Sequence, residues 1–213
     1  MSYPPAPEAN VIRVIAIDPG TDTLGVAIID VDFETLEQTL VYGHTFKASK
    51  DISDYELMSS QRGPKDARLL SHARNLYDLL LCTEPTLVAA ESPFLQRGKV
   101  SAFEALVECY AMLRATVWKY SPTIHLHRID PITAKNYCGV SHIKTDKTHV
   151  REAILKRYAD KTAEGVDLFA MDEHTIDAVA VGNALVRKYL AQEVIESTKK
   201  KKRGGRRRRR KKK

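Results

Sequence analysis

The sequence VIRVIAIDPGT, residues 11–21, gives the strongest indication of the fold. Residues Val11 to Ile17 are almost wholly apolar and rich in β-branched side chains, which predicts a central strand buried on both faces. Pro19 and Gly20 force the chain to turn directly afterwards. Asp18 therefore stands at the end of a buried strand, at the edge of a sheet, where substrate sites often lie.

Outward from this strand, the apolar pattern predicts four more strands and four helices. The strands are expected at residues 24–29, 38–46, 86–90 and 124–129. The helices are expected to begin near residues 66, 101, 145 and 172, the last two ending near 158 and 191. The polar residues 47–65 are predicted to form a surface loop. This order predicts an α/β domain, with a mixed five-stranded sheet flanked by helices.

Apolar stripes predict which faces of two helices are buried. The first stripe consists of Leu69, Leu70, Ala73, Leu76, Tyr77 and Leu80. The second consists of Phe103, Leu106, Val107, Tyr110, Leu113 and Val117. Ser101 and Glu104 have the spacing of a capping box, which predicts that this second helix begins there. Residues 105–117 are expected either in the core or in a dimer interface.

The charge of the chain is concentrated at its C-terminus. The whole sequence has 34 Lys and Arg, 27 Asp and Glu, and a formal net charge of +7. Residues 199–213 hold thirteen of the basic residues and no acid, so the rest of the chain is at −6. We expect a flexible N-terminus over 1–10, a folded domain over 11–192 and a disordered basic tail over 193–213. Such a tail either attracts nucleic acid by releasing its counterions or serves as a targeting signal.

The remaining composition indicates an intracellular protein. Cys82, Cys109 and Cys138 are scattered and odd in number, which fits neither a zinc site nor a disulfide framework and indicates a reducing compartment. No apolar run approaches the roughly 20 residues of a membrane span, so no membrane partner is expected. The cytoplasm or nucleoid is the expected location, and the tail makes the nucleus an alternative.

Acidic side chains recur where apolar segments end. Glu91 follows the predicted strand 86–90, and would converge with Asp18 if the two strands are neighbours. His174 and Asp177 are three residues apart at the start of the last helix and share one face of it. Ala178, Val181 and Leu185 would pack that helix on the sheet. Carboxylates with water and phosphate oxygens are the usual ligands of Mg²⁺, and two such ions can catalyse phosphodiester hydrolysis.

These segments resemble the motifs of the RuvC-type Holliday-junction resolvases. The first motif is similar to residues 15–21 with Gly25, the second to residues 90–94, and the C-terminal motif to residues 174–181. Residues 139–147 resemble the family's glycine-and-lysine stretch. The similarity covers about residues 11–186, and the long segment 47–65 and the basic tail depart from it. A compact chain with an added tail would suit a viral member.

The resemblance implies an RNase H-like fold and a homodimer that nicks two opposed strands of a four-way DNA junction, leaving 5′-phosphates. It implies two Mg²⁺ ions per site, with Mn²⁺ as a substitute, held by Asp18, Glu91, His174 and Asp177. Phe94 would be the aromatic wedge at the junction. The other DNA contacts are expected from Arg97, Lys99, Lys144 and Lys147, with the last two on phosphates.

Three alternatives differ in class from a resolvase. An ATP-binding protein of the actin and sugar-kinase type begins with a similar Asp-x-Gly-Thr, but it needs a second such domain that 213 residues do not provide. Another RNase H-like nuclease, acting on flaps, other branched DNA or RNA–DNA hybrids, would share the metal ligands. A DNA-binding protein without catalysis would depend on the tail.

Overall fold

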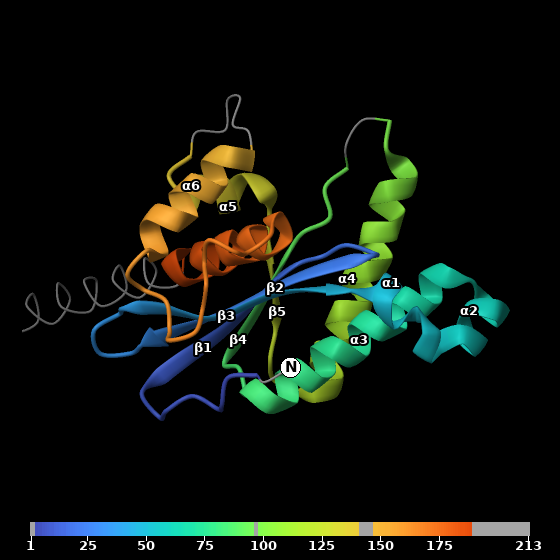
Figure 1. The fold of residues 1–213 in the computed structure, drawn as a ribbon, viewed down its shortest axis with the longest axis horizontal. Helices are drawn as coiled ribbons and strands as arrows, with labels where there is room; N and C mark the ends of the chain where they lie inside the picture. The colour runs from blue at the N-terminus through green and yellow to red at the C-terminus, as the bar shows by residue number, and fades with distance from the viewer. Residues whose placement is uncertain (1–2, 96–97, 141–146, 189–213) are drawn as a thin grey trace, which may run out of the picture.

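The computed structural model describes residues 3–95, 98–140 and 147–188. Its centre is a five-stranded sheet in the order β3-β2-β1-β4-β5 (Figure 1). The strands are β1 (Val11–Asp18), β2 (Thr23–Asp32), β3 (Gln38–Lys47), β4 (Leu87–Glu91) and β5 (Leu126–Ile129). β1, β2 and β3 pair antiparallel, and β1, β4 and β5 pair parallel. The predicted mixed sheet with β1 at its centre is confirmed.

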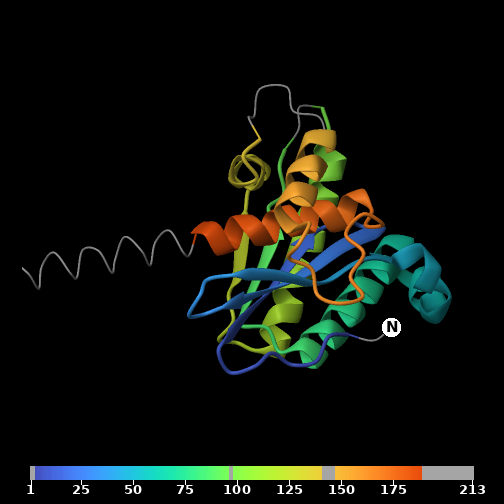
Figure 2. The same ribbon diagram turned by 60° about the vertical axis from the view of Figure 1, so that its left-hand side comes forward.

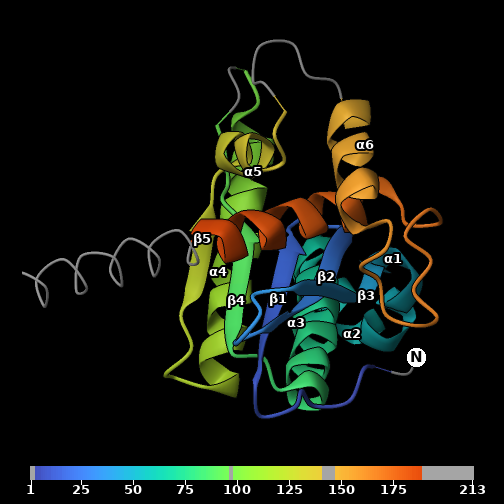
Figure 3. The same cartoon turned by 90° about the vertical axis from the view of Figure 1, so that its left-hand side faces the viewer.

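Each face of the sheet is covered by its own helices, because alternate residues of β1 enter two different cores. Ile15 and Ile17 pack against α3 (Pro64–Thr83) and α4 (Val100–Tyr120). Val14 and Ala16 pack against the opposite layer, which contains α5 (Pro131–Tyr137), α6 (Lys147–Tyr158) and a C-terminal helix at residues 173–188. Figure 3 shows the C-terminal helix crossing one face of the sheet with α3 and α4 behind it, and Figure 2 shows α6 beside that helix.

The segment 47–65, predicted as a surface loop, is mostly helical. It forms α1 (Ala48–Asp51), a 3₁₀ turn η1 (Ile52–Tyr55) and α2 (Glu56–Arg62), which project beside α3 (Figure 1). α1 buries only Ala48 and α2 buries none of its residues. Helices that bury so little need no apolar stripe, so the hydrophobic pattern gave no signal for them.

Other differences concern helix boundaries and faces. The predicted stripe of α3 is wrong at Leu70, which is 40% exposed, while Ser71 and His72 are buried in its place. The capping box is wrong as well, because α4 begins at Val100 after Lys99, and no side chain caps it. α5 was not predicted; Asp130 caps it by accepting from the Thr133 amide at 2.9 Å. The cap predicted at residue 145 lies outside the described residues.

None of the helices in the part of the chain that the structure describes is long and apolar enough to cross a membrane.

Candidate active site

Two carboxyl groups meet where β1 and β4 end side by side. The parallel register places Ile17 beside Ala90, so Asp18 and Glu91 follow at the same edge of the sheet. The side chains of Glu91 and Asp18 hydrogen-bond to each other. Burial, followed by the charges of Asp18 and Asp177, raises the pKa of Glu91 to about 8. Near neutral pH the metal-free site therefore retains a proton between carboxyl groups that would otherwise repel one another.

The C-terminal helix brings two further predicted residues to this edge. A Cβ atom on Gly25 of β2 would lie 2.3 Å from the carbonyl oxygen of His174, so only glycine permits this approach. The predicted stripe of Ala178, Val181 and Leu185 is buried against the sheet. The helix therefore lies across the strands with His174 and Asp177 at the end where Asp18 and Glu91 converge.

Both ring nitrogens of His174 have partners. Nδ1 lies 2.9 Å from Oδ2 of Asp18, and Nε2 lies 3.1 Å from Oγ1 of Thr23. The hydrogen bond to Asp18 raises the pKa of His174, opposed by partial burial. As the side chains stand, His174 orients Asp18. To bind a metal directly, the imidazole would have to release one of these two partners.

A cavity of about 510 Å³ opens over the acidic cluster. Asp18, Glu91 and Asp177 line it together with Phe94, which is 56% exposed. Lys135 of α5 also lines it, and its charge lowers the pKa of Glu91. Sequence reasoning missed this lysine, because the short helix that carries it was not expected. The available signal was its position four residues before Gly139, the first residue of the glycine-and-lysine stretch.

The remaining predicted DNA contacts are only partly described. Lys99 is exposed at the start of α4. Lys147 is the first residue of α6, but its side chain lies outside the described part of the structure, as do Arg97 and Lys144. The structure thus brings the four proposed metal ligands and Phe94 together, and leaves the basic positions as predictions.

The donor set fits a hard divalent cation. Three carboxyl groups and Lys135 line one cavity, and the His174 imidazole contacts Asp18 beside it. Burial and the neighbouring carboxylates raise the pKa of Glu91, and a bound cation would neutralise this excess of negative charge. In the described ranges no three His, Cys, Asp or Glu side chains already enclose a metal position. Binding would therefore need deprotonation of Glu91 and rotation of side chains at this edge.

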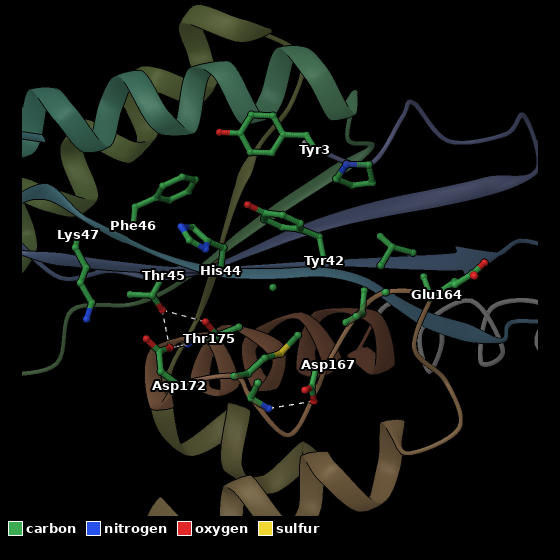
Figure 4. A pocket seen from close by; sticks show the side chains of 18 of the residues that line it. Tyr3, Tyr42, His44, Thr45, Phe46, Lys47, Glu164, Asp167, Asp172 and Thr175 are labelled. Atoms are coloured by element: carbon green, nitrogen blue, oxygen red, sulfur yellow. Dashed lines mark hydrogen bonds between the residues drawn. The ribbon is translucent and has the colours of Figure 1, made fainter. Parts of the chain in front are cut away.

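A second cavity, about 1080 Å³, runs along the edge strand β3 (Figure 4). It is larger, but it contains none of Asp18, Glu91 and Asp177. The larger cavity borders the start of the C-terminal helix, where Thr45 donates to Asp172 at 2.6 Å and lies 2.9 Å from the Thr175 hydroxyl. The convergent carboxyl groups and the raised pKa of Glu91 mark the smaller cavity as the better candidate for catalysis.

Solved structures provide the comparison, since in sequence the chain matches no protein-family model and no curated protein. RuvC of Thermus thermophilus in complex with a Holliday-junction substrate aligns with a TM-score of 0.58 at 17% identity, covering 81% of this chain and 91% of RuvC. The chain has the RNase H-like fold of the RuvC-type resolvases.

Resolvases from two further sources share this fold. The yeast mitochondrial Holliday-junction resolvase Ydc2 aligns with a TM-score of 0.56 at 13% identity, covering 86% of this chain and 80% of Ydc2. The fowlpox virus resolvase with its Holliday-junction DNA aligns at 0.55 and 12% identity, covering 84% of this chain and 99% of the viral one. At these identities the similarity establishes the architecture, and the chemistry must be argued from the site.

Proposed function

We propose that the protein is a metal-dependent DNA endonuclease that resolves four-way junctions by paired symmetrical nicks, leaving 5′-phosphate ends. The observation that carries this proposal is the convergence of Asp18, Glu91, His174 and Asp177 at one edge of the sheet. These residues come from three distant segments, and the fold that unites them is shared with resolvases solved on junction DNA.

The residues of the site divide the work of phosphodiester hydrolysis. Asp18, Glu91 and Asp177, with His174, would hold Mg²⁺ or Mn²⁺, whose chemistry is to activate a water and stabilise the leaving oxygen. Glu91 must first release its proton, and Lys135 favours that release. Lys135 also places a positive charge in the cavity where a phosphate would enter. Thr23 holds the imidazole of His174 in register with Asp18.

Phe94 supports a branched substrate. It lies in the lining of the same cavity as Asp18 and is 56% exposed, although large apolar side chains are usually buried. An exposed aromatic beside a nuclease site gains contact area on unstacked bases, which an intact duplex does not offer. Replacing Phe94 by Ala should therefore weaken cleavage of a junction without altering metal binding.

We also propose that the protein acts as a homodimer, with α4 in the interface. One face of α4 is in the core, while Val107 and Trp118, eleven residues apart, are 42% and 53% exposed on another face. Light scattering should show a dimer that Trp118→Glu converts to a monomer. Phe169→Glu, at a side chain 68% exposed in the loop before the C-terminal helix, should leave the dimer intact. A monomeric wild type would contradict this assembly.

The central experiment compares a labelled immobile four-way junction with matched duplex, flap and RNA–DNA hybrid substrates, using wild type and Asp18→Asn with Mg²⁺ or Mn²⁺. Paired nicks in the junction alone, abolished by the substitution, support a resolvase. Cleavage of the other substrates in preference to the junction would instead support an RNase H-like nuclease that acts on flaps, other branched DNA or RNA–DNA hybrids. Absence of any cleavage would favour a DNA-binding protein without catalysis.

A further inference from the structure

The turn that follows Asp18 accepts hydrogen bonds from two helices that are distant in sequence. The amide of Ala48 in α1 donates to the carbonyl oxygen of Asp22 at 2.9 Å. The thiol of Cys109 in α4 donates to the carbonyl oxygen of Gly20 at 3.5 Å. The position of this turn therefore depends on the helices packed beneath it as well as on β1 and β2.

A group of polar side chains from α3 lies under the same turn. Nε of Arg68 lies 3.7 Å from Oδ1 of Asp22, and both atoms are shielded from solvent. His72 is completely buried next to them, with the carboxylates of Asp22 and Asp51 close enough to act on its ring. Burial lowers the pKa of His72 to about 4, so the imidazole is neutral at physiological pH.

This polar group is costly for the fold. Among the described residues, Nε of Arg68 and Oδ1 of Asp22 have no hydrogen bond of good geometry, and the His72 ring has none beyond an interaction with the Thr21 backbone in the same turn. A buried polar atom left in this state costs about 1–3 kcal/mol, and an apolar side chain of similar size in place of His72 would avoid that cost. Buried polar side chains that disfavour folding and lie beneath the turn after Asp18 indicate a role in the proposed active site.

The position of the turn affects two members of the proposed active site, Asp18 and His174. Asp18 precedes Asp22 by four residues, and the residue after Asp22 is Thr23, whose hydroxyl lies 3.1 Å from Nε2 of His174. The backbone of the turn is tightly packed, because a Cβ atom on Gly20 would lie 2.5 Å from the Thr23 carbonyl oxygen. A displacement of Asp22 would therefore move both the Asp18 carboxylate and the support of His174.

We propose that Asp22, Arg68 and His72 are positioning residues for the active site. Arg68 attracts the Asp22 carboxylate toward α3, and the neutral imidazole of His72 keeps the pocket beneath the turn polar. None of the three lines the cavity that contains Asp18. Their effect on catalysis rests on the proposed nuclease function, whereas their effect on metal affinity can be measured independently of cleavage.

The test combines a double-mutant cycle with substitutions of His72. Asp22→Asn, Arg68→Gln and the double variant are compared for Mn²⁺ affinity by electron paramagnetic resonance, junction affinity, and single-turnover cleavage at saturating metal. Each single change should weaken Mn²⁺ binding and slow cleavage by about 10- to 100-fold, the range expected for small displacements of catalytic groups. Junction affinity should stay unchanged. The double variant should resemble the worse single variant, because both changes break one interaction.

His72→Phe keeps a buried ring without nitrogens and should give the same loss, with thermal stability equal to or above that of wild type. His72→Asn and His72→Gln return a nitrogen near the positions of Nδ1 and Nε2, and at least one should recover Mn²⁺ affinity. Thr116→Val, another polar-to-apolar change at a buried position, seven residues beyond Cys109 on α4, is the matched control and should change none of these readouts.

Several results would overturn the proposal. Independent, multiplicative effects of Asp22→Asn and Arg68→Gln would separate the two residues, and wild-type Mn²⁺ affinity in all variants would leave them a purely structural role. A wild type that binds no Mn²⁺ would refute both this inference and the metal site. If the variants lose Mn²⁺ affinity but wild type cleaves no branched DNA, the positioning role stands and the resolvase function fails.

Discussion

Glu91→Gln should make the metal-free protein more stable while abolishing the proposed metal binding. The pKa of Glu91 is raised from its ordinary 4.5 to about 8, chiefly by burial and then by Asp18. At about 1.36 kcal/mol per pKa unit, the charged form is disfavoured in the fold by up to about 5 kcal/mol. A glutamine in this place stays neutral, and its amide can donate to Asp18 as the protonated carboxyl group does.

The sign of this effect determines its dependence on pH. A group whose pKa is raised in the folded state contributes fully to stability below its unfolded pKa, and that contribution is lost as pH rises to the folded pKa. Wild type should therefore lose stability between about pH 4.5 and pH 8, relative to Glu91→Gln. The difference between the two proteins should be about 1 kcal/mol at pH 5 and reach several kcal/mol at pH 9.

Urea unfolding in a chelating buffer, at one protein concentration and at pH 5, 7 and 9, measures this difference. Glu104→Gln, at an exposed carboxyl group on α4, is the control and should change stability equally at each pH. Adding Mn²⁺ should stabilise wild type and leave Glu91→Gln unchanged, because binding to the folded state alone raises its stability. Parallel pH profiles of wild type and Glu91→Gln would refute the claim that the carboxyl groups repel one another in a buried site.

Three further predictions concern the imidazole, the tail and the helix approach. Because the hydrogen bond to Asp18 raises the pKa of His174 above its ordinary 6.5, the imidazole should already become protonated, and lost as a ligand, as pH is lowered toward 6.5, and activity should fall with it. His174→Asp should move that fall to lower pH, and an unchanged pH–rate profile would reject the role. Removing residues 199–213 should weaken DNA binding and flatten its salt dependence with little change in turnover at saturating DNA, whereas equal salt slopes would contradict a DNA-binding tail. Gly25→Ala should cost about 1–3 kcal/mol in stability by forcing the C-terminal helix away from β2, together with most of the activity. Wild-type stability and activity in this variant would show that the close approach of His174 is not required.

Several features of the candidate site could be predicted because they depend on short-range pattern. An apolar strand that ends in an acid places that acid at the edge of a sheet, and this correctly located Asp18 and Glu91. In the same way, the three-residue spacing of His174 and Asp177 was enough to predict that both side chains lie on one face of a helix. Lys135 was missed because α5, which begins at Pro131 and has only seven residues, is too short for its apolar period to be recognised.

The elements that bury large apolar faces could be predicted from sequence alone, because the period of a strand or helix imposes the pattern of such a face. β1, its turn and the helix after Asp172 belong to this class. The folded structure was needed to show which strands are neighbours, which face of α3 is covered, and that residues 48–62 form helices that bury almost nothing. It also shows that His72 lies beneath the turn after Asp18 and that Glu91 lies beside Asp18, since these contacts join residues 50 or more positions apart in the chain.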